Sequence, residues 1–226
     1  MLSSLPFGSF LAYSPHGKSA AELAARTICR EIKRDGYVRR ELGEERIIPY
    51  AVRRLRECLT PGLADLLAAD VVLVPAPRSA PQLPRQPNAL WVSRSICEAL
   101  RAAGFGQRLE PLLLRRRAVA KSAFARRGAR PGVQEHYDSF AVAPRLGEPP
   151  ARITLIDDVI TRGATLLAGA SRLAEAFPEA TVRAFALVRT QYPGDRERDR
   201  QRFHCVVDPV TARVTRSRYG AWRRDP

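Results

Sequence analysis

The sequence predicts an α/β fold: a mostly parallel central sheet with helices on both faces, together with a small N-terminal hood. Short apolar runs at 71–74, 153–156 and 182–188 have the length and composition of strands that are buried on both sides. Stretches with apolar residues at helical spacing lie between them, from about 90 to 103 and from 166 to 177. Strands that alternate with helices are usually joined by crossover connections, so the pattern favours one parallel sheet.

The N-terminal part of the chain predicts one strand and two helices. The strand lies near Phe10–Tyr13, and a helix follows from about Ala20 to Arg34 with its apolar residues on one face. The second helix runs from about Tyr50 to Leu59 and ends before a Pro-Gly pair. These elements belong to the hood and precede the apolar runs of the core.

We divide the chain into a hood at 1–65, a core domain at 66–190 and a basic C-terminal extension at 191–226. The stretch Ser79–Pro87 is rich in proline, which excludes a helix or a central strand, so we expect a loop there. Residues 115–138 combine a run of basic residues with no apolar periodicity, which predicts a long, mobile, basic loop. Long loops in compact domains are usually functional.

The most informative segment is 153–165, which reads ITLIDDVITRGAT. A short apolar strand is expected to stop at two adjacent carboxylates, Asp157 and Asp158. A loop of small, hydroxyl and basic residues follows, and its members are Thr161, Arg162, Gly163, Ala164 and Thr165. A strand, a tight loop and a helix in this order direct backbone N–H groups and a helix N-terminus at one point, which suits a phosphate.

The paired acids suit a sugar. An ionised carboxylate can accept hydrogen bonds from two vicinal hydroxyl groups, so Asp157 and Asp158 predict a diol site beside the phosphate site. A phosphate site and a diol site together describe a phosphorylated ribose. The alternative is an ordinary strand–turn–helix whose acids cap the helix. A cap, however, requires neither paired acids nor two threonines around a glycine.

The 153–165 segment resembles the phosphoribosyl pyrophosphate (PRPP) signature of type I phosphoribosyltransferases: a hydrophobic strand, two acids, an apolar residue and a Thr/Gly-rich loop. Arg162 departs from the signature, in which a threonine or a small residue is commoner. The segment Val71–Ser79 resembles the first core strand and pyrophosphate loop of the same family. It is most similar to the ComF-type (amidophosphoribosyltransferase-like) group, in which Pro-x-Pro follows that strand. The resemblance covers about residues 10–190, without the zinc module often found ahead of ComF-type domains.

The resemblance implies a reaction and a set of ligands. A nitrogen acceptor, which the sequence does not identify, attacks C1 of PRPP as pyrophosphate leaves, and Mg²⁺ is bound through PRPP. Asp157 and Asp158 would act as catalytic residues by holding the ribose hydroxyls. The 161–165 loop, from Thr161 to Thr165, would bind the 5′-phosphate through its backbone. The expected partners are therefore PRPP and a small-molecule acceptor.

The resemblance also indicates which residues bind pyrophosphate, the leaving group. Ala76, Arg78 and Ser79 would offer backbone N–H groups and one guanidinium to the pyrophosphate. A catalytic cation, either Lys121 or an arginine of 115–117, would close over it. The histidines and cysteines make no metal-ligand pattern in the sequence, so we expect no metal site built by the protein alone.

The chain has a net charge of +15, and Lys18, Lys33 and Lys121 are its lysines, so arginine dominates. The positive charge concentrates at 108–130 and 196–224. A basic surface attracts anions, and the anion can be PRPP or a nucleic acid. The alternative function is therefore a ComF-like nucleic-acid-binding or regulatory protein on a phosphoribosyltransferase scaffold. The sequence leaves both a monomer and a homodimer open.

The sequence predicts a cytoplasmic protein with no membrane partner. The cysteines at 29, 58, 97 and 205 are scattered and form no CxxC pair, which favours a reducing compartment. No apolar run reaches membrane-spanning length, and the first residues lack the basic start and long apolar stretch of a signal peptide.

Overall fold

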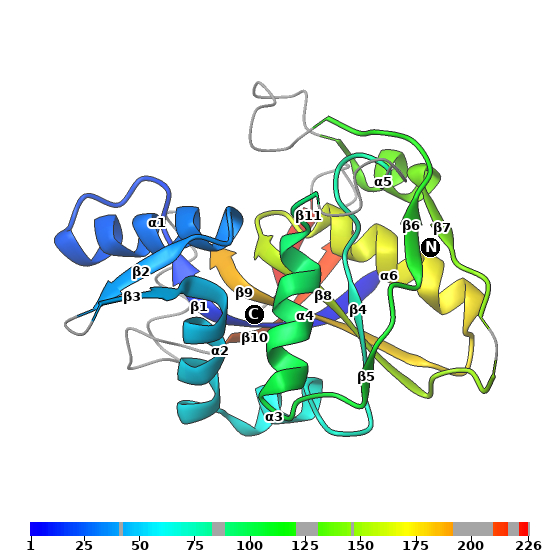
Figure 1. The fold of residues 1–226 in the computed structure, drawn as a ribbon. Helices are drawn as coiled ribbons and strands as arrows, with labels where there is room; N and C mark the ends of the chain where they lie inside the picture. The colour runs from blue at the N-terminus through cyan, green and yellow to red at the C-terminus, as the bar shows by residue number, and fades with distance from the viewer. Residues whose placement is uncertain are drawn as a thin grey trace.

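The computed structural model describes residues 1–40, 43–82, 89–120, 131–145, 147–191, 210–216 and 222–225. This part of the chain contains a seven-stranded central sheet, two short hairpins and six helices (Figure 1). The strands of the central sheet are β1 (Ser4–Tyr13), β4 (Val72–Pro75), β5 (Arg108–Leu109), β8 (Arg152–Ile160), β9 (Thr181–Thr190), β10 (Val210–Arg216) and β11 (Trp222–Asp225). The helices are α1 (Ala20–Lys33), α2 (Ile47–Glu57), α3 (Pro61–Leu66), α4 (Val92–Ala102), α5 (Val133–Ser139) and α6 (Ala164–Ala176).

The strand order of the central sheet is β11-β10-β1-β9-β8-β4-β5. The five strands from β1 to β5 in this order are all parallel to their neighbours, and the remaining two, β10 and β11, continue the sheet beyond β1 in antiparallel pairing. The predicted fold class, a mostly parallel sheet with helices on both faces, is confirmed. β1 from the N-terminal segment and β10 from the C-terminal segment lie side by side in the sheet.

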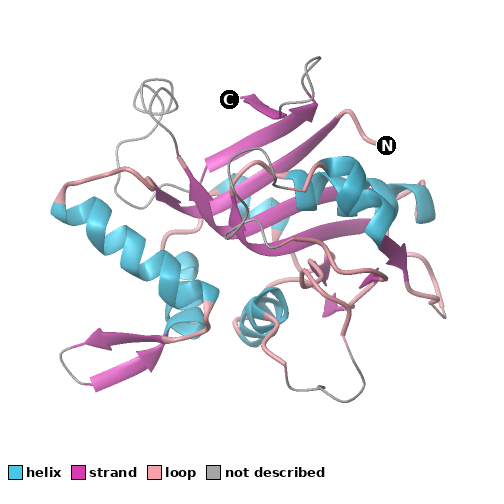
Figure 2. Cartoon of the chain, turned by 90° about the horizontal axis from the view of Figure 1, so that it is seen from above, coloured by secondary structure: helices cyan, strands magenta, loops and turns pink. Residues whose placement is uncertain are grey.

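The two faces of the sheet are covered by different helices (Figure 2). Side chains of β4 alternate between two hydrophobic clusters, because successive residues of a strand point to opposite faces. Val72 and Val74 pack in a cluster that includes α6, whereas Leu73 packs in a cluster that includes α1, α2, α3 and α4. Gly169 allows α6 to approach the sheet closely: a Cβ atom there would lie 2.9 Å from side-chain carbons of Leu113 and Leu155. The parallel strands are therefore buried on both sides, as their uninterrupted apolar sequences indicate.

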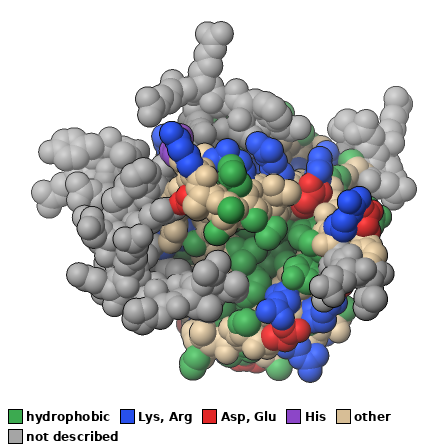
Figure 3. Space-filling model, turned by 90° about the vertical axis from the view of Figure 1, so that its left-hand side faces the viewer, with side chains coloured by type: hydrophobic (Ala, Val, Ile, Leu, Met, Phe, Trp, Pro, Cys, Tyr) green, Lys and Arg blue, Asp and Glu red, His purple; other side chains and the backbone are tan. Residues whose placement is uncertain are grey.

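Two antiparallel hairpins lie outside the central sheet. The first pairs β2 (Tyr37–Arg40) with β3 (Gly43–Arg46) and projects beside α1 (Figure 2). The second pairs β6 (Leu113–Arg115) with β7 (Phe140–Val142), and α5 comes directly before β7. The side of the molecule that carries α1 and the first hairpin has hydrophobic side chains near its centre, with lysine and arginine side chains around them (Figure 3). As far as it is described, this side is not a uniformly basic surface.

The predicted long loop at 115–138 is wrong at both ends. Arg115 belongs to β6, and α5 includes 133–138. Periodicity did not reveal this helix, because its buried residues are Val133, His136 and Ser139, of which only the valine is apolar. Residues 121–130 lie outside the described part of the chain.

Strand β8 continues past the acids at which we expected it to stop. Its pairing with β9 includes Asp157 with Ala186 and runs on to Ile160, so the backbone ladder, rather than apolarity, sets the end of this strand. The break expected after Leu59 is instead the start of α3, in which Pro61 occupies a first-turn position that tolerates a missing N–H.

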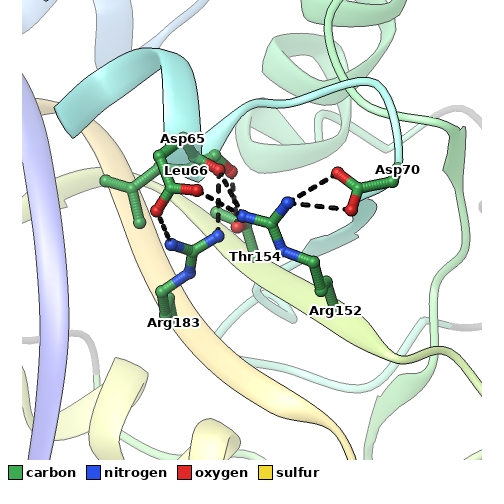
Figure 4. A network of polar contacts seen from close by, with 6 residues as sticks. All are labelled: Asp65, Leu66, Asp70, Arg152, Thr154 and Arg183. Atoms are coloured by element: carbon green, nitrogen blue, oxygen red, sulfur yellow. Dashed lines mark hydrogen bonds and ion pairs between the residues drawn. The ribbon is translucent and has the colours of Figure 1, made fainter. Parts of the chain in front are cut away.

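The amino-terminal ends of β8 and β9 are joined to the segment around α3 by a network of arginines and carboxylates (Figure 4). Arg152 Nη1 donates to both carboxylate oxygens of Asp70 at 2.7 and 2.8 Å, and its Nη2 donates to Asp65 Oδ1 at 2.5 Å. Arg183 makes a second ion pair with Asp65. The hydrogen bonds from Arg183 and Arg152 lower the pKa of the Asp65 carboxyl. The network fixes the amino-terminal end of these strands to the segment around α3.

Candidate functional site

A cavity of about 490 Å³ opens at the carboxyl ends of β4 and β8. Parallel α/β sheets usually bind ligands at this edge. Every predicted site residue in the described part of the chain lines it: Ala76, Arg78, Ser79, Asp157, Asp158, Thr161, Arg162, Gly163, Ala164 and Thr165. Lys121, the predicted catalytic cation, lies outside the described residues.

The loop before α6 presents an uncapped helix N-terminus to the cavity. Gly163 is the N-cap, with φ of 74° and ψ of 6°, a left-handed conformation that residues with a Cβ atom rarely adopt. A glycine has no side chain with which to cap the first N–H groups of the helix, and no side chain of the described residues caps them. The N–H groups of Ala164 and Thr165 have no acceptor within the described part of the chain. These groups and the helix dipole favour an anion at this point.

In the loop after β4 three carbonyl groups are engaged, and so is the Ala76 N–H, which donates to the Ile156 carbonyl at 2.7 Å. The expectation that Ala76 offers its N–H to pyrophosphate is therefore wrong. The carbonyl of Ala76 accepts from Trp91 Nε1 at 2.7 Å, that of Arg78 accepts from Arg115 Nε at 2.9 Å, and that of Ser79 accepts from the Val119 N–H at 2.8 Å. The N–H groups of Arg78 and Ser79 have no acceptor among the described residues. A second group of unpaired N–H donors therefore lines the same cavity.

Asp157 and Asp158 lie in the carboxyl-terminal part of β8, are partly buried and line the cavity. Oδ1 of Asp157 accepts from the Asp158 N–H at 2.9 Å and from the Ser93 hydroxyl at 3.3 Å. Oδ1 of Asp158 accepts from the Val159 N–H at 2.8 Å. The protein thus orients Oδ1 of each carboxylate, and both side chains line the cavity. Desolvation, and secondarily the neighbouring charge of Asp158, raises the pKa of the Asp157 carboxyl well above its usual value.

Arg115 is a buried guanidinium in the cavity wall, with only 7% of its surface exposed. Its donors reach the Arg78 carbonyl, Ser139 Oγ and His136 Nδ1, and its guanidinium lies 4.0 Å from the centre of the Phe140 ring. It makes no ion pair with any described carboxylate, whereas many surface arginines of this chain do. Burial lowers the pKa of Arg115 to about 10, so it remains charged at neutral pH. The charges of Asp157 and Glu135 act on Arg115 from a distance, but neither forms an ion pair with it. A buried cation that no described carboxylate contacts directly favours an anion at this point.

His136 connects Arg115 to the loop before α6. Its Nδ1 lies 3.4 Å from Arg115 Nη1, and its Nε2 lies 3.4 Å from the Thr165 hydroxyl oxygen. Burial and, to a lesser extent, the Arg115 charge lower the pKa of His136 to about 4. The imidazole is therefore neutral at physiological pH.

Sequence reasoning missed several lining residues, among them Lys33, Trp91, Ser93 and His136. They come from α1, from the start of α4 and from α5, which the fold brings to the strand ends from distant parts of the chain. One sequence feature could have indicated that His136 is buried. It lies three residues before Ser139, at helical spacing, and just ahead of the apolar strand β7.

The described residues contain no group of three or more histidine, cysteine, aspartate or glutamate side chains that could hold a metal ion. No helix in the described ranges is both long and apolar enough to cross a membrane.

Comparison of the chain with models of known protein families gives no match, and a search among curated proteins gives none either.

Proposed function

We propose that the protein is a type I phosphoribosyltransferase, most similar to the ComF-type group, that transfers the 5-phosphoribosyl group of PRPP to a nitrogen acceptor and releases pyrophosphate. One observation carries the proposal: a single cavity contains a pair of carboxylates and two separate loops with unpaired N–H groups. The loop at 161–165 suits the 5′-phosphate, the carboxylates suit the ribose hydroxyls, and the loop at 76–79 suits the pyrophosphate. The cavity volume of about 490 Å³ is within the usual range for small-molecule sites.

The chemistry requires stabilisation of charge on both sides of C1. The bond from C1 to the pyrophosphate oxygen breaks with both electrons leaving on pyrophosphate, while the acceptor nitrogen donates a lone pair to C1. Arg115 and the free N–H groups of Arg78 and Ser79 would stabilise the negative charge that grows on the leaving group. Asp157 and Asp158 would hold the ribose hydroxyls so that C1 faces the acceptor.

The site residues also fit Mg²⁺ carried by PRPP. Carboxylate oxygens are ligands that Mg²⁺ prefers. The raised pKa of Asp157 reflects desolvation and the neighbouring charge of Asp158, and a nearby cation would lower the cost of ionising this pair of acids. Bound with PRPP, the ion would neutralise part of the diphosphate charge. Because the described residues form no three-ligand metal site, we expect PRPP to supply most of the ligands of the ion.

The net charge of +15 supports a second candidate, a nucleic-acid-binding or regulatory protein on the same scaffold. Much of the basic surface in the described part of the chain is already neutralised, as in the ion pairs of Arg53 with Glu45 and Arg94 with Glu98. A nucleic-acid binder would also gain nothing from paired acids at the floor of a cavity. We therefore favour the enzyme.

Titration calorimetry with PRPP and Mg²⁺ tests the proposal. The wild-type protein should bind PRPP, and at a hundredfold excess of PRPP over its dissociation constant the fold should be stabilised by about 2.7 kcal/mol. The double variant Asp157→Asn, Asp158→Asn should fold and lose this binding. Glu98→Gln, a change at an exposed residue of α4 outside the cavity, is the matched control and should bind normally. Absence of wild-type binding at millimolar PRPP would exclude the proposed function.

A further inference from the structure

The hydrogen bonds around His136 have a fixed direction. Arginine has donors and no acceptor, so in the contact of 3.4 Å between Arg115 Nη1 and His136 Nδ1 the arginine donates. Nδ1 must then be unprotonated. A neutral imidazole carries one proton, which therefore resides on Nε2. The low pKa of His136 is consistent with this neutral form.

The tautomer of His136 also fixes the direction of its hydrogen bond to Thr165. His136 Nε2 carries a proton, so it donates to the Thr165 hydroxyl oxygen, which lies 3.4 Å away. The hydroxyl then accepts from His136 and keeps its own hydrogen for another acceptor. Thr165 is in the first turn of α6, beside the free N–H groups of the helix, and its hydroxyl makes no other hydrogen bond with a described residue. Its hydrogen is thus available to a ligand in the cavity.

We propose that Arg115, His136 and Thr165 form a chain of directed hydrogen bonds that presents the Thr165 hydroxyl hydrogen to a phosphate group of the ligand, with His136 as the positioning residue. The chain joins the two anion-binding parts of the cavity: Arg115 is bonded to the loop at 76–79, and Thr165 belongs to the loop at 161–165. For the identity of the phosphate, namely the 5′-phosphate of PRPP, this inference rests on the proposed function.

The chain also accounts for the position of Arg115. Nε and Nη1 of Arg115 are bonded to protein acceptors, which holds the guanidinium against the cavity wall. Nη2 has no acceptor among the described residues. Arg115 therefore acts in two ways. It fixes the tautomer of His136 through Nη1, and it leaves Nη2 for a second anionic oxygen of the ligand.

Two amide substitutions of His136 distinguish the effect of hydrogen-bond direction from the effect of packing. Glutamine places its amide nitrogen near the position of Nε2, so His136→Gln can still donate to Thr165. Asparagine reaches only the position of Nδ1, so His136→Asn can accept from Arg115 but leaves Thr165 without a donor. We expect His136→Gln to bind PRPP with Mg²⁺ within about threefold of wild type and His136→Asn to bind about tenfold more weakly, the size of one hydrogen bond to a charged ligand.

Thr165→Val removes the hydroxyl and should weaken PRPP binding as His136→Asn does, and the combination of both changes should add little to either alone. Equal affinity for PRPP in His136→Gln, His136→Asn and wild type would overturn the proposed hydrogen-bond chain. Fully additive losses of affinity for His136→Asn and Thr165→Val would overturn it as well. Circular dichroism of each variant checks that it is folded.

A spectroscopic measurement tests the chain without any ligand. Long-range proton–nitrogen NMR spectra of protein with isotope-labelled histidine distinguish the two neutral tautomers, and His136→Gln identifies the signal of His136. We expect the Nε2–H tautomer at neutral pH. A proton on Nδ1 would overturn the chain even if PRPP binds. If PRPP fails to bind while the Nε2–H tautomer is present, the proposed function fails and the hydrogen-bond chain stands.

Discussion

The hydroxyl of Ser93 donates to Oδ1 of Asp157 at 3.3 Å and so joins the first turn of α4 to the carboxyl end of β8. This contact orients a carboxylate that its surroundings make costly to ionise, because desolvation and the charge of Asp158 both raise the pKa of Asp157. A fold that keeps two adjacent acids on a cavity floor retains them at a cost in stability, which is typical of a functional site.

Replacement of this acid should therefore stabilise the free protein. A raised pKa means that Asp157 contributes most to stability below the unfolded-state pKa of about 3.8, and that this contribution is lost as pH rises through the folded-state pKa. Asp157→Asn removes that loss. We expect its free energy of unfolding at pH 7 to exceed that of wild type by on the order of 1 kcal/mol, with PRPP binding abolished. Urea denaturation at pH 4 and pH 7 measures the effect, and a gain that does not grow with pH would contradict it.

His136 should give the opposite pH dependence. Its pKa falls from 6.5 to about 4 on folding, so the unfolded chain binds more protons between these values. The contribution of His136 to stability is complete above pH 6.5 and is lost as pH falls toward 4, by about 3 kcal/mol in total. The measurement is the difference in unfolding free energy between wild type and His136→Gln across this window, because all other acids and histidines titrate in both proteins. A difference that is independent of pH would show that the imidazole is not held neutral.

The conformation of Gly163 should be required for both folding and binding. An L-residue at φ of 74° costs about 1–2 kcal/mol, and a Cβ atom here would adjoin the N–H groups that face the ligand. Gly163→Ala should lose this amount of stability and bind PRPP more weakly. Gly132→Ala is the matched control, because Gly132 has φ of −80° and nothing lies within 4 Å of the added Cβ atom. Chemical denaturation should show almost no change for the control.

The network at the opposite end of the sheet should affect stability without affecting the site. Arg152 bonds to two aspartates and to the Asp65 carbonyl, and it lies at the amino end of β8. Arg152→Met should lower the melting temperature more than Asp70→Asn, because the arginine change breaks both links and leaves the Asp65 carbonyl with one donor fewer. The PRPP dissociation constant of both variants should equal that of wild type. A weakened affinity would indicate coupling between the two ends of the sheet.

The features that the sequence predicts well are local ones. The strands of the core appear as apolar runs because parallel strands are buried on both faces, and the paired acids and the Gly163 loop are contiguous in the chain. The loop at 76–79 was recognisable because it directly follows β4. All of these lie at strand ends, and a parallel sheet brings such ends together, so their convergence on one cavity follows from the fold class.

Features that depend on tertiary packing could not be predicted in this way. His136 lies on a short helix whose buried face is largely polar, so the sequence predicts a mobile basic loop there. Ser93 has no pattern of its own and acts through one hydroxyl that α4 directs at Asp157. The extension of β8 beyond its acids depends on a ladder with β9, which begins more than twenty residues later in the chain. In each case the deciding interaction is with a residue distant in sequence.

The salt dependence of nucleic-acid binding distinguishes the enzyme from the nucleic-acid binder. A chain with a net charge of +15 should bind DNA or RNA without sequence preference at low salt under either hypothesis, because phosphate contacts release counterions. If the protein is an enzyme, this binding should collapse by about 0.2 M salt while PRPP binding persists. PRPP should displace the polymer only where both occupy the cavity.

The contribution of the C-terminal arginines makes this comparison quantitative. If nucleic acid is the physiological ligand, changing Arg198 and Arg200 to glutamine should reduce the logarithmic salt slope by about two, close to one per phosphate contact. The matched control changes Arg54 and Arg94, exposed arginines that are paired with Glu57 and Glu98, and it should leave the slope nearly unchanged. Tight binding at physiological salt that depends on Arg198 and Arg200, and that ignores both PRPP and the Asp157/Asp158 substitutions, would favour the binding protein. A slope that neither pair of changes alters, with affinity lost by about 0.2 M salt, would leave the basic residues as a surface that attracts PRPP to the cavity.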